Sequence, residues 1–388
     1  MSTVIKMYNA YFGDCFVIEN NNSNLVVDYG TRSDSNPIYK SVDDVLDGIA
    51  NDLDKYSEKQ LLITHFHYDH ISGLTKLYSD SRRMMFEKVY IPNIWNNSFA
   101  IASNLMEEAI LSLLLKKSMI PDYTSGTISI FDLLIYLCGS ARKIMLLKRG
   151  DIFENSQYIT LLPDDIVINK IEARFGEDIP TLLSGLRNDI VLLSERISSF
   201  FTESEYLFEN VYEYRSVLID QLQKLRSDYD NILSNINSEF IDEETIEGVE
   251  SYYLKLNKLN NKISLVFQNV ISNDCNLLFT GDVDKSDLKR IAKKTDIPLH
   301  KHYKYIKVPH HGTESHYFDF KRYSPEWLLI PNGFTKKNDT ISSNYGSDGL
   351  NKLCSNSNHC DNCSGSCKSS TSCNSLRNIV YPCICRMV

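Results

Sequence analysis

Short apolar runs bounded by turn residues predict strands in the first half of the chain and again towards its end. Such runs are typical of strands, whereas apolar residues that recur every three or four positions predict helices. The predicted strands cover residues 4–8, 12–18, 25–30, 61–64, 88–92, 144–147, 159–163 and 276–280. The predicted helices outside the middle of the chain cover about 40–54, much of 97–140 and about 284–295.

Two apolar series in the middle of the chain follow a heptad-like spacing. The first is Leu183, Leu186, Ile190, Leu193, Ile197 and Phe200, and the second is Leu218, Leu222, Leu225, Tyr229, Ile232 and Ile236. We therefore predict an antiparallel helical hairpin or coiled coil over about 180–258, with a third helix at about 243–258. Three roles remain open: packing within the chain, an arm that binds a second copy or another protein, or a cover over the active-site face.

Ligand-type side chains crowd into the stretch LLITHFHYDHISGL at residues 61–74. Histidine is a common ligand of transition metals, and a carboxylate adds charge and hardness. In extended backbone, His65 and His67 point to the same side, while Asp69 and His70 lie where the loop turns into a helix. This spacing suits two neighbouring cations about 3.5–4 Å apart. The alternative is a histidine-rich surface turn.

The sequence Thr64-His-x-His-x-Asp-His resembles the defining motif of the metallo-β-lactamase-fold hydrolases. Later segments, including a glycine-aspartate turn and the stretch KVPHHGT at 307–313, are similar to the hydrolase domain of the competence protein ComEC. The resemblance implies an α/β fold, a four-layer αββα sandwich with the site at one edge between two sheets.

The predicted helical insertion divides the part of the chain that resembles these hydrolases. We expect the hydrolase domain in two parts, at 1–170 and 259–350, around a helical insertion at 171–258. A Cys-rich segment with a last strand should follow at 351–388.

The resemblance also implies a ligand set, which consists of His65, His67, Asp69, His70, Asp282 and His311. Asp282 follows Gly281 at the end of a strand and resembles the aspartate that bridges two cations in this family; a helix N-cap is the alternative. Asp28 resembles an aspartate that braces the metal-binding loop, and a turn-capping aspartate is the alternative.

The stretch around His310 and His311 completes the predicted site. We assign His311 as a ligand and His310 as the neighbour that faces substrate, although the order could be reversed. Thr313 stands where the related enzymes have serine and keeps the hydroxyl. His316 is a further candidate contact, with a surface histidine as the alternative.

One ligand of the usual pattern is missing, because no histidine lies between His70 and His300. Asn261 or Ser264, a water or a substrate oxygen would have to complete the first cation position, and ComEC-like domains also lack this histidine. The second position has Asp69, His70, Asp282 and His311, so we expect it to bind its cation more tightly. Open, oxygen-rich coordination suits manganese as well as zinc.

Cysteines cluster near the C-terminus, where the surrounding residues are too small and polar to build a core. A structural zinc held by four ligands from this segment is the economical interpretation. The alternatives are a reduced-thiol loop and a set of disulfides. The candidate ligands are Cys354, Cys360, Cys363, Cys367, Cys373 and His359.

The net charge and the apolar content of the chain limit the kinds of partner that we expect. The chain of 388 residues has a formal net charge of −9, which weighs against a broad nucleic-acid-coating protein but not against a nuclease. There is no signal-peptide pattern and no uninterrupted apolar run of membrane-spanning length. We therefore expect a cytoplasmic protein that does not engage a membrane.

The predicted function is metal-dependent hydrolysis of a phosphodiester, with nucleic acid among the candidate substrates. Metal-bound hydroxide would attack phosphorus, Asp69 would orient it, and His310 or His316 would stabilise the phosphate or protonate the leaving oxygen. This choice of bond rests on likeness to ComEC and phosphorylcholine esterases. The alternatives are hydrolysis of a small ester or lactone, and a partner-gated effector subunit of a bacterial defence assembly.

Overall fold

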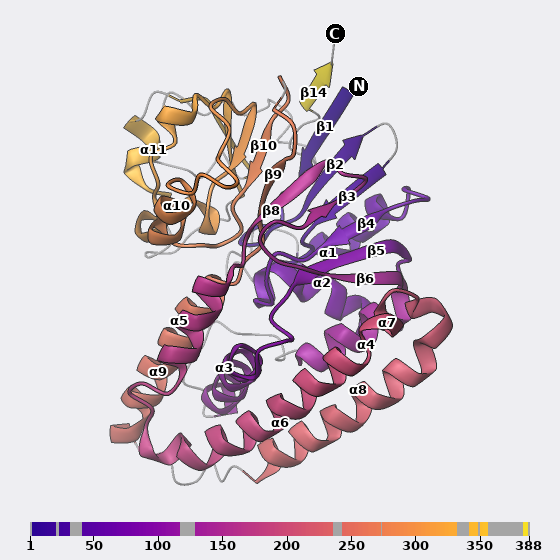
Figure 1. The fold of residues 1–388 in the computed structure, drawn as a ribbon, viewed down its shortest axis with the longest axis vertical. Helices are drawn as coiled ribbons and strands as arrows, with labels where there is room; N and C mark the ends of the chain where they lie inside the picture. Colours follow the sequence, from indigo (N-terminus) through magenta and orange to yellow (C-terminus); the bar gives the residue numbers. More distant parts are fainter. Residues whose placement is uncertain are drawn as a thin grey trace.

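Two seven-stranded sheets form the centre of the computed structural model (Figure 1). The structure describes residues 2–20, 23–31, 41–116, 129–235, 243–272, 274–331, 341–347, 350–355 and 383–386. The first sheet has the order β14-β1-β2-β3-β4-β5-β6, and the second has the order β13-β12-β11-β10-β9-β8-β7. The mixed α/β fold predicted from the sequence is confirmed.

The first sheet contains β1 (Ser2–Met7), β2 (Phe16–Asn20), β3 (Ser23–Val27), β4 (Gln60–Leu62), β5 (Phe86–Pro92), β6 (Ala141–Leu147) and β14 (Cys383–Arg386). The second contains β7 (Ile152–Phe153), β8 (Tyr158–Leu162), β9 (Val266–Asn269), β10 (Leu277–Phe279), β11 (Tyr305–Lys307), β12 (Trp327–Ile330) and β13 (Lys352–Cys354). Strands β3 to β6 run parallel to one another, and so do β10 to β13. Parallel neighbours place their carboxyl ends at the same edge of a sheet.

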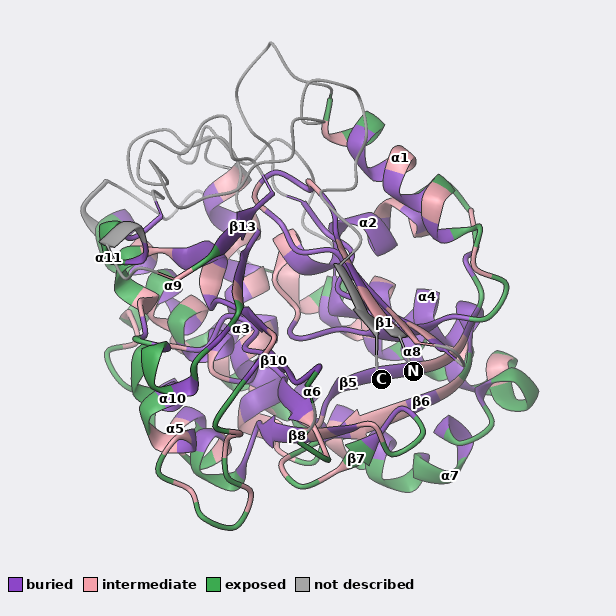
Figure 2. Ribbon diagram, turned by 90° about the horizontal axis from the view of Figure 1, so that it is seen from above, coloured by how far each residue is buried: buried purple, intermediate pink, exposed green. Residues whose placement is uncertain are grey.

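Alternation along the strands places one set of side chains between the sheets and the other set under helices. Phe16 of β2 and Phe279 of β10 meet across the gap, with ring centroids 5.3 Å apart. Their neighbours in the two strands, Val17 and Leu278, face the opposite way and belong to the larger core that includes the helices. Both faces of each sheet are therefore buried, and Figure 2 shows the central strands mostly in the buried colour.

Helices cover the outer faces of the two sheets. The first sheet shares a core with α1 (Val42–Leu53), α2 (Tyr68–Ser79) and α4 (Ile130–Ser140), and the second shares it with α10 (Lys285–Ile291). Helix α1 begins at Ser41, whose hydroxyl accepts a hydrogen bond from the Asp44 amide at 3.1 Å, as an N-cap residue does. Shorter helical segments are η1 (Thr181–Leu183), η3 (His310–Gly312), η4 (Glu314–His316), η5 (Lys321–Tyr323) and α11 (Ser343–Ser347).

The middle of the chain forms a helical layer beside the sheets (Figure 1). It consists of α3 (Ser98–Lys116), α5 (Asp165–Phe175), α6 (Ser184–Glu203), α7 (Glu205–Phe208), α8 (Val211–Ser234) and α9 (Glu243–Asn261). Helix α6 packs against α3, α8 packs against α4, and α6 and α8 also touch each other. Apolar residues of the predicted series, such as Ile190 and Leu222, are fully buried in this layer. The heptad-like faces are thus used in packing within the chain, and the predicted dimerisation arm stays a prediction.

Helix α3 is the one described helix that is long and apolar enough to cross a membrane by length and composition. In its window Ser98–Leu115, 61% of the residues are buried inside the fold. The helix contacts α5, α6 and α9, so its apolar composition has an explanation in core packing.

Candidate metal centre

The predicted site residues lie at one edge of the two sheets, in the loops and helix starts that follow parallel strands. Asp28 follows β3, and the segment from Thr64 to His70 follows β4. Asp282 follows β10, and the histidine pair follows β11. The Leu265 amide donates to the Thr64 carbonyl at 2.8 Å and ties the two sheets together at this edge.

Four of the predicted ligands converge on one point. The ligand atoms of Asp69, His70, Asp282 and His311 all lie within 4.8 Å of one another. His70, Asp282 and His311 are buried, whereas Asp69 is partly exposed. This set is the predicted second cation position, and the structure places His311 in it rather than His310.

The ring nitrogens of this set leave room for a cation. His311 donates through Nδ1 to the Pro331 carbonyl at 3.2 Å, and its Nε2 lies 3.2 Å from an Asp69 carboxylate oxygen. His70 Nε2 lies 3.3 Å from Asp282 in the same way. A nitrogen that faces a carboxylate this closely must carry a proton or share a cation with it. The donor set of two carboxylates and two imidazoles fits a divalent transition metal.

His65 and His67 form the less complete half of the site. Their ring centroids are 4.7 Å apart, and the His65 ring lies 4.1 Å from that of His70. His65 is fully buried, yet its Nε2 makes no hydrogen bond to any described residue. A buried nitrogen without a partner is costly unless it binds something, so a cation at this position would account for it.

Three histidines each have a carboxylate beside one ring nitrogen. His70 Nδ1 lies 2.8 Å from Asp28, and His311 Nδ1 lies 3.3 Å from Asp14. His67 Nε2 lies 3.2 Å from Glu107. Metal-binding histidines usually donate their other ring N–H to such a partner, which fixes the ring and the tautomer.

Asp28 contacts two residues of the segment that it was predicted to brace. Its carboxylate accepts hydrogen bonds from the amide and the hydroxyl of Thr64, both at 2.7 Å, in addition to the contact with His70. Burial raises the pKa of Asp28, although the nearby His70 opposes this effect. The carboxylate thus joins two points of the metal-binding loop rather than capping a local turn.

Close backbone packing holds the loops in register. The Asp14 amide donates to the Asp69 carbonyl at 3.1 Å, and the Tyr29 amide donates to the His70 carbonyl at 2.9 Å. A Cβ on Gly30 would lie only 2.6 Å from the Asp69 backbone. Glycine is therefore required where these loops meet, because no side chain fits between them.

Lys307 supplies a buried positive charge that sequence reasoning did not assign. Its ammonium lies 2.6 Å from Asp14, 3.2 Å from Asp282 and 2.8 Å from the Gly281 carbonyl, and the side chain is 1% exposed. Burial opposes ionisation of all these groups, yet their mutual attraction outweighs it. The pKa of Lys307 is therefore raised, and that of Asp282 lies well below its usual value.

The N-cap alternative for Asp282 is wrong. Helix α10 begins after Asp284, whose carboxylate accepts a hydrogen bond from the Asp287 amide at 2.9 Å. The Asp282 carboxylate instead faces Lys307 and His70. Its own amide donates to the Ser264 hydroxyl at 3.1 Å.

Ser264 and Asn261 differ in their position relative to the ligand set. The Ser264 hydroxyl donates to the Asn261 carbonyl at 2.8 Å and accepts from Asp282, so it supports backbone rather than facing the ligand set. The Asn261 amide nitrogen lies 3.4 Å from His310 Nδ1. Its side-chain oxygen is buried without a hydrogen bond to any described residue, which keeps it available as a cation ligand.

His310 and His316 stack beside the ligand set, with ring centroids 4.1 Å apart. His316 Nδ1 is held by the hydroxyls of Thr313 and Ser315 at 3.0 and 2.9 Å. Both His310 and His311 have positive φ angles, 46° and 53°, which non-glycine residues seldom adopt. Such backbone strain persists where surrounding contacts fix it, and it often marks a functional site.

Sequence reasoning missed four further groups around the site: Asp14, Glu107, Asn257 and Asn260. Asn257 and Asn260 donate to Glu107 at 2.8 and 2.5 Å and belong to α9. Gly13-Asp14 between two strands and the acid pair in the apolar helix α3 were usable signals. The asparagine contacts had no local signal, because about 150 residues separate their partners along the chain.

The predicted zinc segment lies mostly outside the described residues. Cys354 is buried in β13, whereas Cys360, Cys363, Cys367, Cys373 and His359 fall outside the described part. The structural zinc therefore stays a prediction.

A comparison with known protein families agrees with a metal-binding site at these residues. Residues 8–81 match the family model described as the metallo-beta-lactamase superfamily, and this match includes Asp14, Asp28 and the histidines of the main motif. No curated protein matches the chain. The superfamily match supports a metal-dependent hydrolase in general and says nothing about the substrate.

A solved structure is also similar, namely the metallo-beta-lactamase fold protein YhfI from Bacillus subtilis. The alignment has 8% identity, covers 87% of this chain and 88% of that chain, and gives a TM-score of 0.32.

Proposed function

We propose that this protein is a metal-dependent phosphodiesterase. The observation that carries the proposal is the convergence of Asp69, His70, Asp282 and His311, from loops of two sheets, within 4.8 Å. His65 and His67 would complete a neighbouring position. Cations held by these groups would polarise the substrate and make an attacking water more acidic.

The accessible carboxylate of the set is Asp69. Its side chain is 19% exposed and lines a pocket, whereas Asp282 is 2% exposed. Asp69 is therefore the group that can accept a hydrogen bond from the attacking water and orient it. Lys307 keeps Asp282 and Asp14 ionised and holds them in place from the buried side.

His310 is suited to hold a phosphoryl oxygen. Burial lowers its pKa to about 3, so the ring is neutral near pH 7. Because the Asn261 amide nitrogen faces Nδ1, the ring proton belongs on Nε2, which can donate a hydrogen bond. This favours a hydrogen-bonding role over the predicted transfer of a proton from a charged His310, and the same direction of shift applies to His316.

The choice of a phosphodiester rests on the sequence. KVPHHGT and the missing third histidine resemble ComEC-like hydrolase domains, whose bond class we extend to this chain by analogy. A nuclease is one form of this proposal. The layer formed by α6 and α8 remains a candidate surface for a protein partner, as the effector alternative requires.

Hydrolysis of bis(p-nitrophenyl) phosphate by manganese- and zinc-loaded protein tests the proposal. Asp282→Ala should lower the rate at least about a thousandfold, since several kcal/mol of charge stabilisation would depend on the bound cations. Asp319→Ala, at an exposed position on the same half of the chain, serves as the matched control. Absence of hydrolysis with cations shown to be bound would refute the phosphodiesterase.

A further inference from the structure

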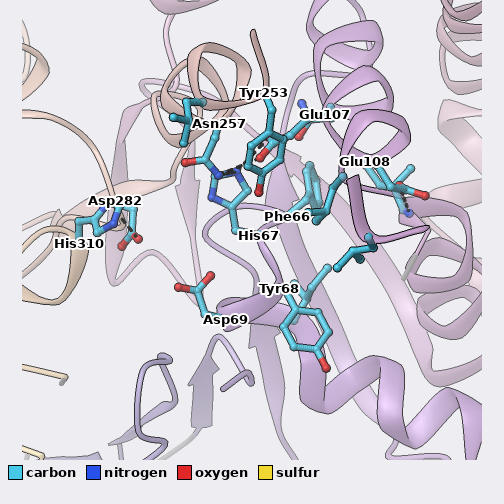
Figure 3. Close-up of a pocket in the computed structure, with 16 residues that line it drawn as sticks. Phe66, His67, Tyr68, Asp69, Glu107, Glu108, Tyr253, Asn257, Asp282 and His310 are labelled. Atoms are coloured by element: carbon cyan, nitrogen blue, oxygen red, sulfur yellow. Dashed lines mark hydrogen bonds and ion pairs between the residues drawn. The ribbon is translucent and has the colours of Figure 1, made fainter. Parts of the chain in front are cut away.

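A pocket of about 270 Å³ opens directly beside the candidate metal centre. Asp69, Asp282 and His310 lie at one end of it, and helices α3 and α9 contribute the opposite wall (Figure 3). Most of the remaining lining is apolar or aromatic, and it includes Phe66, Tyr68, Leu111, Leu115, Tyr253 and Leu254. The helical layer therefore shapes the space next to the ligand set.

The acids in this wall offer nothing to an anionic ligand. Glu107 is taken up by His67, Asn257 and Asn260. Glu108 accepts a hydrogen bond from the Ile130 amide at 3.1 Å, and burial raises its pKa to about 8. Glu108 is thus mostly protonated near pH 7, and none of the described residues that line the pocket is a lysine or arginine.

Such a wall favours one kind of substituent. Among the described residues of this wall, a second phosphate group would meet two carboxyl groups and no lysine or arginine, whereas an uncharged apolar group would gain by leaving water. The chain as a whole carries a net charge of −9, which also disfavours a polyanion. A volume of about 270 Å³ corresponds to roughly nine water molecules, enough for a phenyl ring or a chain of about six carbons.

We propose that this pocket binds an uncharged apolar or aromatic arm of the substrate, so that the substrate is a small diester with one hydrophobic substituent rather than a nucleic-acid strand. The inference rests on the proposed phosphodiesterase activity for the scissile group. It assigns specificity to α3 and α9, which lie outside the strand-end loops that carry the ligands.

Binding of methyl alkyl phosphates tests the inference without an aryl group competing for the pocket. Methyl, butyl, hexyl and dodecyl members are titrated calorimetrically into the manganese-loaded protein. Affinity should rise by about threefold to fourfold for each methylene buried up to about six carbons, and then level off as the pocket fills. Affinity that does not change between the methyl and hexyl members would overturn the inference.

Two variants connect the effect to this wall. Leu111→Gln places an amide within the pocket, and Leu254→Asp places a charge at a rim position that is 54% exposed and tolerant of substitution. Both should flatten the dependence on chain length, while Leu192→Asp, at a position on α6 that is 60% exposed, should leave it unchanged. A dependence that survives in both pocket variants would place the arm elsewhere and overturn the inference.

The two proposals fail in different ways. If bis(p-nitrophenyl) phosphate is hydrolysed but affinity does not depend on chain length, the pocket inference alone is wrong. If affinity depends on chain length but no diester is hydrolysed, the reaction is wrong and an apolar ligand in the pocket is still supported. Single-stranded DNA hydrolysed with a higher kcat/KM than hexyl p-nitrophenyl phosphate would overturn the small-diester class.

Discussion

The two halves of the candidate metal centre are built differently. Asp69, His70, Asp282 and His311 meet from both sheets and are supported by Asp14, Asp28 and Lys307. His65 and His67 come from one loop, and the outer support of His67 is Glu107 on helix α3. The first set needs only a cation to be complete, whereas the second also needs a ligand that the described residues have not supplied. We therefore expect the first set to bind its cation more tightly.

The largest effect should follow from removing the buried charge behind the complete half. Lys307→Met leaves Asp14 and Asp282 without their cationic partner, which should lower the free energy of unfolding by about 3–5 kcal/mol. Urea denaturation in EDTA measures it. Added manganese should recover part of the loss, because its charge compensates the same carboxylates. An equal loss with and without manganese would contradict a cation beside Asp282.

The histidine pair offers the next test. His311→Ala should weaken binding of the tighter cation at least about 100-fold, because losing a ligand costs more than losing its outer partner. His310→Ala should change this affinity less than threefold, on the order of the scatter expected for a residue that does not ligate. Calorimetric titration of the two variants separates these roles. The reverse pattern would mean that the ligand assignment within the pair is wrong.

Glu107→Gln probes the incomplete half and should have a smaller effect. It keeps the shape of the side chain but removes the charge that orients His67, so the weaker cation should bind about 10–100-fold less tightly. The tighter cation should be unaffected. Titration of manganese followed by electron paramagnetic resonance resolves the two classes, and equal weakening of both would remove the contrast between the halves.

Glu108→Gln is the neighbouring control and should have the smallest effect on cation binding. Burial raises the pKa of Glu108 to about 8, above its usual value of 4.5. Its contribution to stability is thus full below about pH 4.5 and is lost as the pH rises towards 8. Compared with the variant, the native protein should lose stability over this range by at most about 1.4 kcal/mol per pH unit.

Thermal unfolding of both proteins from pH 5 to 8 measures the difference, and cation binding should be the same in both. Parallel pH profiles would show that Glu108 does not carry the raised pKa. Weakened cation binding in Glu108→Gln would mean that the effect of Glu107→Gln is not specific to His67.

The pattern of apolar and polar residues predicted those parts of the site that consist of a strand and the residues directly after it. The apolar runs before Asp28, Thr64 and Asp282 become β3, β4 and β10, and their loops meet at one edge. The second strand was placed at 12–18, whereas β2 is Phe16–Asn20. The predicted strand began too early because Gly13 and Asp14 form part of the site loops instead.

Contacts between distant segments could not be read in this way. The heptad-like spacing of α6 and α8 predicted buried faces correctly but not their main partners, α3 and α4. Lys307 is the first residue of the KVPHHGT motif, but its contact with Asp14 depends on how the two sheets pack. The boundary predicted between residues 170 and 171 falls inside helix α5, whose apolar residues Val167, Ile171 and Phe175 are all buried.

The hydrogen bonds from Asn257 and Asn260 to Glu107 have a consequence for any attempt to divide the protein. Through these bonds α9, the last helix of the helical layer, holds Glu107, and Glu107 in turn contacts His67. A shortened protein without α9 would keep the predicted histidine and carboxylate ligands, but it would lose Asn261 and the asparagines that hold Glu107 beside His67. The two sheets and the helical layer are therefore connected through Glu107, and movement of α9 would be transmitted to the candidate metal centre.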